Sequence, residues 1–301
     1  MARPPAVSRA SRVHPIVIAT ALGCVLVTPA ASQAPDYTPP EVRRLTARTL
    51  RVFEAPEATQ GAAANRRHFY AIGNTVIAKY EIASGRRVGE WAGPRNGPIR
   101  HMNSCLADAG RIWCANSNYS QTPMGSSIEV FDADTLAHVA SHSLGMMDEG
   151  SLTWFDRHRD GWIAGFAHYD GTGGVPFKNH RFSSVVAFDR DWRRTGGWLF
   201  PSTAIERMAP YAASGGAIGP DGWLYLLGHD RPEMYVVARP SMGPTLIHLA
   251  TIDLEANGQA FSWSQDRSRT VFTVDRRKGL VRHIEIPAVL PSDPRISGRF
   301  R

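Results

Sequence analysis

The chain has 301 residues, of which 43% are apolar and eight are tryptophan, so it can bury a large core. Its formal net charge is +7, but no run of five or more lysines and arginines occurs, and we expect no nucleic-acid partner. GxSxG, HExxH, CxxC and nucleotide-binding glycine motifs are all absent from the sequence. The usual serine hydrolases, zinc proteases and nucleotide enzymes are therefore disfavoured, and we expect no nucleotide cofactor.

Residues 1–34 are predicted to be an export signal. Three arginines and no acidic residue precede the apolar run PIVIATALGCVLVTPA, and small residues follow it. That run is too short for a transmembrane helix, so we expect no membrane span and a periplasmic or extracellular location. Alternatively, Cys24 within ALGC would be the site of a lipoprotein anchor.

Three further segments follow the signal. Residues 35–44 contain three prolines and are predicted to form an extended lead-in. Residues 45–290 are predicted to form a single domain, because all-β architectures commonly reach this size. The segment 291–301, PSDPRISGRFR, is predicted to be a flexible tail.

Short β-rich runs separated by Gly, Asp and Pro recur after residue 45, and no helical period persists, which predicts an all-β fold. LADAGRIW, RHRDGWI and IGPDGWLY each place Asp and Gly before an aromatic strand, as in a tight hairpin. Strands such as IEVFD and VVAFD follow and end in an aromatic residue and an acid. The repeating units span 60–93, 100–145, 149–201, 212–254 and 258–287, a spacing typical of four-stranded propeller blades.

We therefore predict a β-propeller of five blades, or of six if residues 31–60 contain a further partial sheet. The fifth unit lacks its last strand, and LTARTLRVFEAP at 45–56 is free to supply it and close the ring. This repeat architecture resembles the bacterial secreted β-propellers that include lactonases, virginiamycin-type lyases and muconate-lactonizing enzymes. The resemblance covers nearly the whole mature chain. It implies a small-molecule site on the axis, but no motif carries over catalytic residues.

Polar residues gather where first strands begin and second strands end, which is the same face of a propeller. Three histidines are among them, and GWIAGFAHYD and GWLYLLGHD each place a histidine at a strand end. Imidazoles with a carboxylate suit a divalent metal ion. The predicted metal ligands are His101, His168, His229 and Glu149.

Without a metal, His168 or His229 would act as general base, with Glu149 as a further catalytic carboxylate. The predicted substrate contacts are Asn74, Asn103, Asn118, Gln259 and Arg276. Because side chains alternate along a strand, only one of each adjacent pair can face the axis, and we favour the histidines.

Two functions from different classes fit this pattern. The first is an exported hydrolase, lyase or isomerase acting on a small polar compound, sugar- or lactone-like. The second is a non-catalytic propeller that binds a glycan or a protein partner through the loops 119–127 and 170–182.

A disulfide is predicted between Cys105 and Cys114. A two-residue turn at Ala109 and Gly110 would place these cysteines opposite each other as a non-hydrogen-bonded pair. Export to an oxidising compartment would favour the bond.

Overall fold

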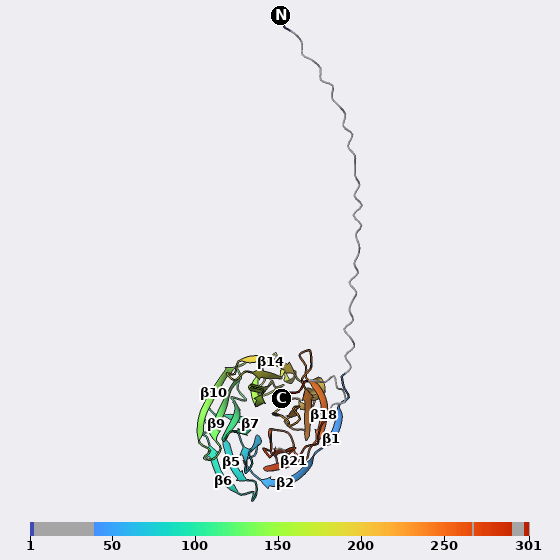
Figure 1. The fold of residues 1–301 in the computed structure, drawn as a ribbon. Helices are drawn as coiled ribbons and strands as arrows, with labels where there is room; N and C mark the ends of the chain where they lie inside the picture. The colour runs from blue at the N-terminus through green and yellow to red at the C-terminus, as the bar shows by residue number, and fades with distance from the viewer. Residues whose placement is uncertain (3–38, 267, 291–297, 301) are drawn as a thin grey trace. The chain divides into compact units, whose positions relative to one another are not determined.

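The computed structural model describes residues 1–2, 39–266, 268–290 and 298–300 (Figure 1). The fold lies within residues 39–301. Apart from its first two residues, the expected signal peptide lies outside the described residues, as do residues 35–38 of the lead-in. Export and lipid anchoring therefore stay predictions.

Five sheets form a ring, four of them with four strands and one with five, and each sheet is one blade (Figure 1). Blade 1 contains β3 (Gly61–Ala64), β4 (His68–Ile72), β5 (Val76–Glu81) and β6 (Arg87–Ala92). Blade 2 contains β7 (His101–Asp108), β8 (Arg111–Ser117), β9 (Gly125–Asp132) and β10 (His138–Met146). Blade 3 contains β11 (Ser151–His158), β12 (Gly161–Ala167), β13 (Ser184–Phe188) and β14 (Arg194–Leu199).

The last two blades each include a strand from the N-terminal segment that precedes blade 1. Blade 4 contains β15 (Gly215–Ile218), β16 (Leu224–Leu227), β17 (Glu233–Ala238) and β18 (Ile247–Asp253), and β1 (Arg43–Thr46) pairs parallel to β18. Blade 5 contains β19 (Phe261–Trp263), β20 (Thr270–Asp275), β21 (Leu280–Glu285) and β2 (Arg48–Glu54). The prediction of a five-bladed propeller closed by an N-terminal strand is thus confirmed.

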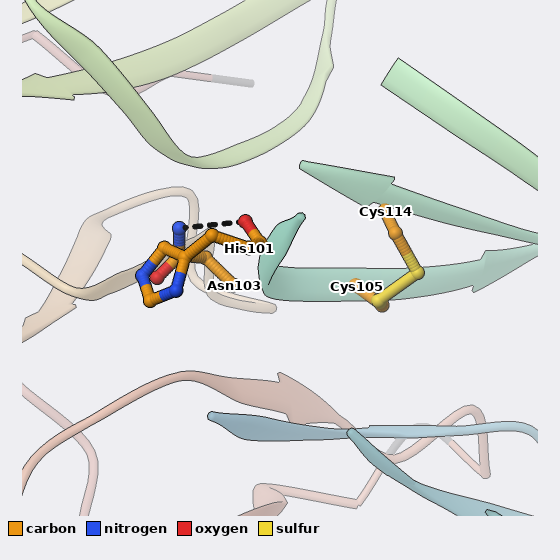
Figure 2. Close-up of a disulfide and its surroundings, with 4 residues drawn as sticks. All are labelled: His101, Asn103, Cys105 and Cys114. Carbon is orange, nitrogen blue, oxygen red and sulfur yellow. Dashed lines mark hydrogen bonds between the residues drawn. A yellow bond between two sulfur atoms is a disulfide. The ribbon is translucent and has the colours of Figure 1, made fainter. Parts of the chain in front are cut away.

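Tight turns set the register of the inner hairpins. Ala109 and Gly110 have φ values of 48° and 73°, so both central residues of the turn are left-handed, as a two-residue hairpin requires. Cys105 then lies opposite Cys114, with their Cα atoms 4.1 Å apart, and a disulfide joins them. Figure 2 shows this bond between β7 and β8, with His101 and Asn103 nearer the start of β7. The predicted pairing is confirmed.

The core lies between the blades. Apolar side chains alternate along each strand, so each sheet presents one set to the preceding blade and another to the following one. Among the described residues, five buried clusters correspond to the five interfaces between blades. Trp154 lies in the cluster between blades 3 and 4 and is fully buried. Its ring occupies the space that a Cβ on Gly165 or Gly216 would need, at 2.1 and 2.4 Å from ring atoms.

Two features lie outside the repeat. Helix α1 (Ser202–Met208) connects β14 to β15, and a single 3-10 turn, η1 (His180–Phe182), precedes β13. No described helix has the length and apolarity needed to cross a membrane. Of the expected tail, 291–297 and residue 301 are not described, whereas Phe300 is fully buried and its carbonyl contacts His158 Nδ1 at 2.5 Å.

Candidate functional site

The polar strand ends gather on one face of the ring, which we name the histidine face: the face at which β7, β11, β15 and β19 begin. Inner-strand backbones approach closely beneath it. A Cβ added to Gly61 would lie 2.7 Å from Ala260 Cβ and 3.3 Å from Asn103 O. A Cβ on Gly215 would likewise lie 2.7 Å from Ala260 Cα. The inner strands of neighbouring blades are therefore closely packed below the polar rim.

His229 is the best-connected histidine of this face. Its Nδ1 lies 2.9 Å from Asp230 Oδ1, and Arg276 Nη1 lies 2.9 Å from its Nε2. Because a guanidinium can only donate, Nε2 accepts and the proton of the neutral ring is on Nδ1, facing Asp230. Burial lowers the pKa of His229, and Arg276 and Arg277 lower it further, against the opposing effect of Asp230. The imidazole is therefore neutral at neutral pH.

His101 belongs to the same group. It is partly buried at the start of β7, and burial, Arg276 and His229 lower its pKa from 6.5 to about 4. An effect of both residues on this pKa means that the three side chains lie within electrostatic reach of one another. Blades 2, 4 and 5 thus each contribute a side chain to one cluster.

A chain of three tyrosine rings also connects His101 to His229. The ring of His101 lies 4.9 Å from Tyr119, and Tyr119 contacts Tyr169 edge-on at 5.0 Å. Tyr169 lies 6.4 Å from Tyr211, and Tyr211 stacks on His229 at 3.9 Å. Burial raises the pKa of Tyr119 and of Tyr169, so these phenols stay protonated. We name these five rings with Arg276 the axial cluster.

Two loops support the axial cluster. Tyr119 begins the loop after β8, and a Cβ on Gly173 of the loop after β12 would lie 2.5 Å from its ring. The second loop is held by His180, whose Nδ1 contacts Asp170 Oδ1 at 2.8 Å, and by Arg181, whose Nε donates to Glu206 of α1 at 2.5 Å. The predicted loops 119–127 and 170–182 therefore pack against each other on the histidine face.

Other predicted site residues lie elsewhere. His168 is 3% exposed, its Nε2 contacts the Asp148 carbonyl at 3.2 Å, and burial lowers its pKa. Glu149 forms an ion pair with Arg194 of β14 at 3.2 Å. At positions 168 and 169 it is therefore the tyrosine, not the histidine, that joins the axial cluster.

The predicted amide contacts differ in availability. Asn118 closes its own loop through Gly125 N and the Pro123 carbonyl, at 2.9 and 3.0 Å. Asn74 is exposed and accepts a hydrogen bond from Gln60 at 2.8 Å. Asn103 is buried, and within the described ranges its side chain makes a single long hydrogen bond, to the His101 carbonyl at 3.5 Å (Figure 2). Gln259 is 1% exposed, and its Nε2 has no hydrogen-bond partner in the part of the chain that the structure describes.

The four residues expected to bind a metal ion do not lie in one group in the described structure. His168 and Glu149 are engaged with Asp148 and Arg194, and a guanidinium lies beside His101 and His229. Across residues 39–266, 268–290 and 298–300, no group of three His, Cys, Asp or Glu side chains is placed to hold a metal ion. A divalent metal stays a prediction, and elemental mass spectrometry of the purified protein would check it.

Tyr119 and Tyr211 were not predicted. Tyr119 directly follows the strand end at Asn118, as Tyr169 follows His168, so the repeat contained a signal for an aromatic residue there. Tyr211 comes after α1, outside the repeat, and only the tertiary fold brings it onto His229.

Two hollows lie near the axis. One of about 190 Å³ is lined by inner strands of all five blades, including Ala64, Asp108 and Trp263 at their far ends, so it opens away from the histidine face. The other, of about 570 Å³, is lined by Tyr169 and residues 170–171 and 174–179. The second hollow therefore adjoins the axial cluster through Tyr169.

Comparisons with known proteins show distant likeness to solved structures. A chain of a mitotic checkpoint complex aligns with 92% of this chain and all of its own length, at 12% identity and a TM-score of 0.41. U3-55K aligns with 83% of this chain and all of its own length, at 9% identity and a TM-score of 0.38. A Bacteroides caccae protein of unknown function aligns with 69% of this chain and 65% of its own, at 12% identity and a TM-score of 0.38.

No family model and no curated protein matches the sequence. The structural likenesses are too distant to carry a functional argument. What is established is the class of the fold, a β-propeller, and the resemblance to the lactonase and lyase group stays an expectation.

Proposed function

We propose that the chain is an exported β-propeller that binds a small polar molecule at the axial cluster and acts on it as a hydrolase, lyase or isomerase. The observation that carries the proposal is the position of His229, between Asp230 and Arg276 and stacked on Tyr211. A carboxylate that orients an imidazole beside a cation is the arrangement that general acid-base chemistry uses.

The chemistry follows from the two ring nitrogens. Arg276 donates to Nε2, so the proton of the neutral ring is on Nδ1, 2.9 Å from Asp230 Oδ1, and Nε2 is the basic atom. When Arg276 turns to an oxyanion forming on the substrate, Nε2 is released to take a proton from water or from a carbon beside a carbonyl. Tyrosine rings on the opposite wall would stack on the apolar face of a sugar or lactone ring.

Export is supported by the disulfide between Cys105 and Cys114, which persists in oxidising compartments, together with the signal-like residues 1–34. A secreted propeller with a polar axial site also agrees with the resemblance noted in the sequence.

The test is a turnover screen of lactones and unsaturated or cyclic sugar acids with the wild type, His229→Gln and Tyr211→Leu. His142→Gln is the matched control, since His142 is exposed on β10. We expect His229→Gln to lose at least tenfold in kcat, Tyr211→Leu to raise KM, and the control to match the wild type. Full activity of His229→Gln would contradict the proposed role.

A second candidate is a non-catalytic propeller that binds a protein or glycan through the two loops. Phe177 is 89% and Phe182 52% exposed on the loop 170–182, and an exposed aromatic pair is typical of a contact surface. Replacing both by serine would then abolish binding, whereas His229→Gln would leave it unchanged.

A further inference from the structure

Arg276 is a cation that has no ion-pair partner among the described residues. It is partly buried at the end of β20, and its hydrogen bond goes to a neutral imidazole, His229 Nε2. No carboxylate in the described ranges forms an ion pair with its guanidinium, although many other arginines of the chain have such a partner. Asp230 lies nearby, with its Oδ1 2.9 Å from His229 Nδ1. Withdrawing a cation from water without an anion costs free energy, so the site is suited to receive one.

Unused hydrogen-bond donors accompany this cation. Gln259 begins the connection into β19, its backbone N–H bonds to the Gly228 carbonyl next to His229, and its buried Nε2 has no partner among the described residues. The Asn103 amide donates only a long bond of 3.5 Å. An excess of donors over acceptors at one rim favours a ligand that accepts hydrogen bonds.

The walls restrict the shape of the ligand. Tyr211 and His229 are stacked at 3.9 Å, and Tyr119 and Tyr169 meet edge-on at 5.0 Å, so flat aromatic surfaces border the cation. Beneath it, inner strands of neighbouring blades approach closely at Gly61 and Gly215. A planar anion fits both the charge and the aromatic walls, and a guanidinium binds a carboxylate through two parallel hydrogen bonds.

We propose that the axial cluster is a carboxylate-binding site, in which Arg276 is the counter-charge, Gln259 donates to the same anion and the tyrosines contact the body of the ligand. This inference rests on the proposed function, because it specifies the charge of the molecule bound there. Such a ligand competes with His229 for Arg276, so binding would also release His229 Nε2.

The experiment compares isosteric probes. Binding of benzoate, acetate and succinate, and of the neutral benzamide and acetamide, is measured by isothermal titration calorimetry and by ligand-observed NMR on the full protein. The variants are Arg276→Ala, Arg276→Lys and Gln259→Leu. Arg190→Ala removes the same charge from an exposed position on the turn between β13 and β14 and is the matched control.

We expect at least one carboxylate to bind at least tenfold more tightly than its amide. Arg276→Ala should weaken that binding at least tenfold, Arg276→Lys should restore part of it, and Arg190→Ala should leave it unchanged. Circular dichroism of each variant verifies folding.

Equal binding of acid and amide, an unaffected Arg276→Ala variant, or no carboxylate binding at all would each overturn the carboxylate site. The proposed function fails separately: it would survive those results if a neutral lactone were turned over and His229→Gln abolished that turnover. If no lactone or sugar is turned over while carboxylates bind through Arg276, the carboxylate site stands and the enzymatic proposal is lost.

Discussion

At the scale of single residues, the axial cluster contains two histidines whose lowered pKa values keep their imidazoles neutral. Burial lowers the pKa of both His101 and His229, and the nearby Arg276 lowers each of them further. The axis of a propeller favours lowered histidine pKa values, because strand ends from different blades converge there and water is partly excluded. The two histidines are therefore neutral bases held beside a permanent cation.

His101 should remain neutral well below its usual pKa. Since the folded pKa is about 4 and the model-peptide value 6.5, the unfolded chain binds the proton first as the pH falls. The stabilisation is therefore fully present above pH 6.5 and is lost between about pH 6.5 and 4, by up to about 3 kcal/mol. An NMR titration of the His101 ring would check this.

In the Arg276→Ala variant the pKa of His101 should rise, because a positive neighbour has been removed. The Arg190→Ala variant should leave the pKa of His101 unchanged. A His101 ring that titrates near pH 6.5 in the wild type would contradict the burial and the charge environment described for it.

The disulfide gives a second prediction at residue scale. It closes a loop with a sequence separation of 9, and the chain-entropy model assigns such a loop about 2–3 kcal/mol of stability. Replacing Cys105 and Cys114 together by alanine should lower the free energy of unfolding by that amount in guanidinium titrations. A double variant as stable as the oxidised wild type would show that the bond adds nothing to the hairpin.

At the scale of elements, packing between blades depends on glycines that admit Trp154. A Cβ on Gly216 would lie 2.4 Å from Trp154 Cδ2 and 2.5 Å from Cε2, in a fully buried contact. Gly216→Ala should therefore destabilise the protein by about 1–3 kcal/mol in urea unfolding, the usual range for overpacking a core.

Gly196→Ala is the matched control, because an added Cβ at Gly196 of β14 meets nothing within 4 Å. In a Gly216→Ala, Trp154→Leu double variant the loss of stability should be smaller than the sum of the two single losses, since the smaller side chain leaves space for the added Cβ. Equal stability of the two single alanine variants would disprove the steric argument.

The elements also show what the sequence could predict and what it could not. The register of the hairpin at Ala109 and Gly110 was predicted because a two-residue turn determines which residues face each other. Strand β1 was missed, because its parallel pairing with β18 connects segments about 200 residues apart and has no local pattern. Helix α1 has only 7 residues, too few for a helical period to stand out.

The same distinction applies to the site. Strand ends are visible in the repeat, so His101, His229 and Arg276 could be assigned to one face. Which neighbour of a pair faces the axis depends on loop conformation, and the choice of His168 over Tyr169 therefore had no basis in the pattern. The place of Tyr211 depends on the connection through α1 and could be found only in the fold.

At the scale of the whole molecule, the ring is closed by one strand from the other end of the chain. Strand β2 pairs antiparallel with β21. The ring centroid of Phe53 in β2 lies 4.7 Å from that of Phe69 in blade 1 and 6.3 Å from that of Phe272 in blade 5. Phe53 is 4% exposed. The closing strand thus completes one blade and also fills the interface with the next, so hydrogen bonding and packing at the joint are coupled.

Removing β2 should therefore destabilise the protein more than the loss of its strand pairing alone, because the interface with blade 1 is lost as well. A chain that starts at Pro39 is the reference, one that starts at Arg48 lacks only β1, and one that starts at Ala55 lacks both strands. We expect the chain that starts at Arg48 to unfold at a somewhat lower temperature, because it loses the outermost pairing of blade 4.

The chain that starts at Ala55 should lose its cooperative transition in calorimetry, since the edge of β21 and the apolar side chains around Phe69 become exposed to water. Adding a synthetic 48–54 peptide in excess should restore a transition whose midpoint rises with peptide concentration. A chain starting at Ala55 that unfolds cooperatively near the reference temperature would show instead that four complete blades hold the ring without its closing strand.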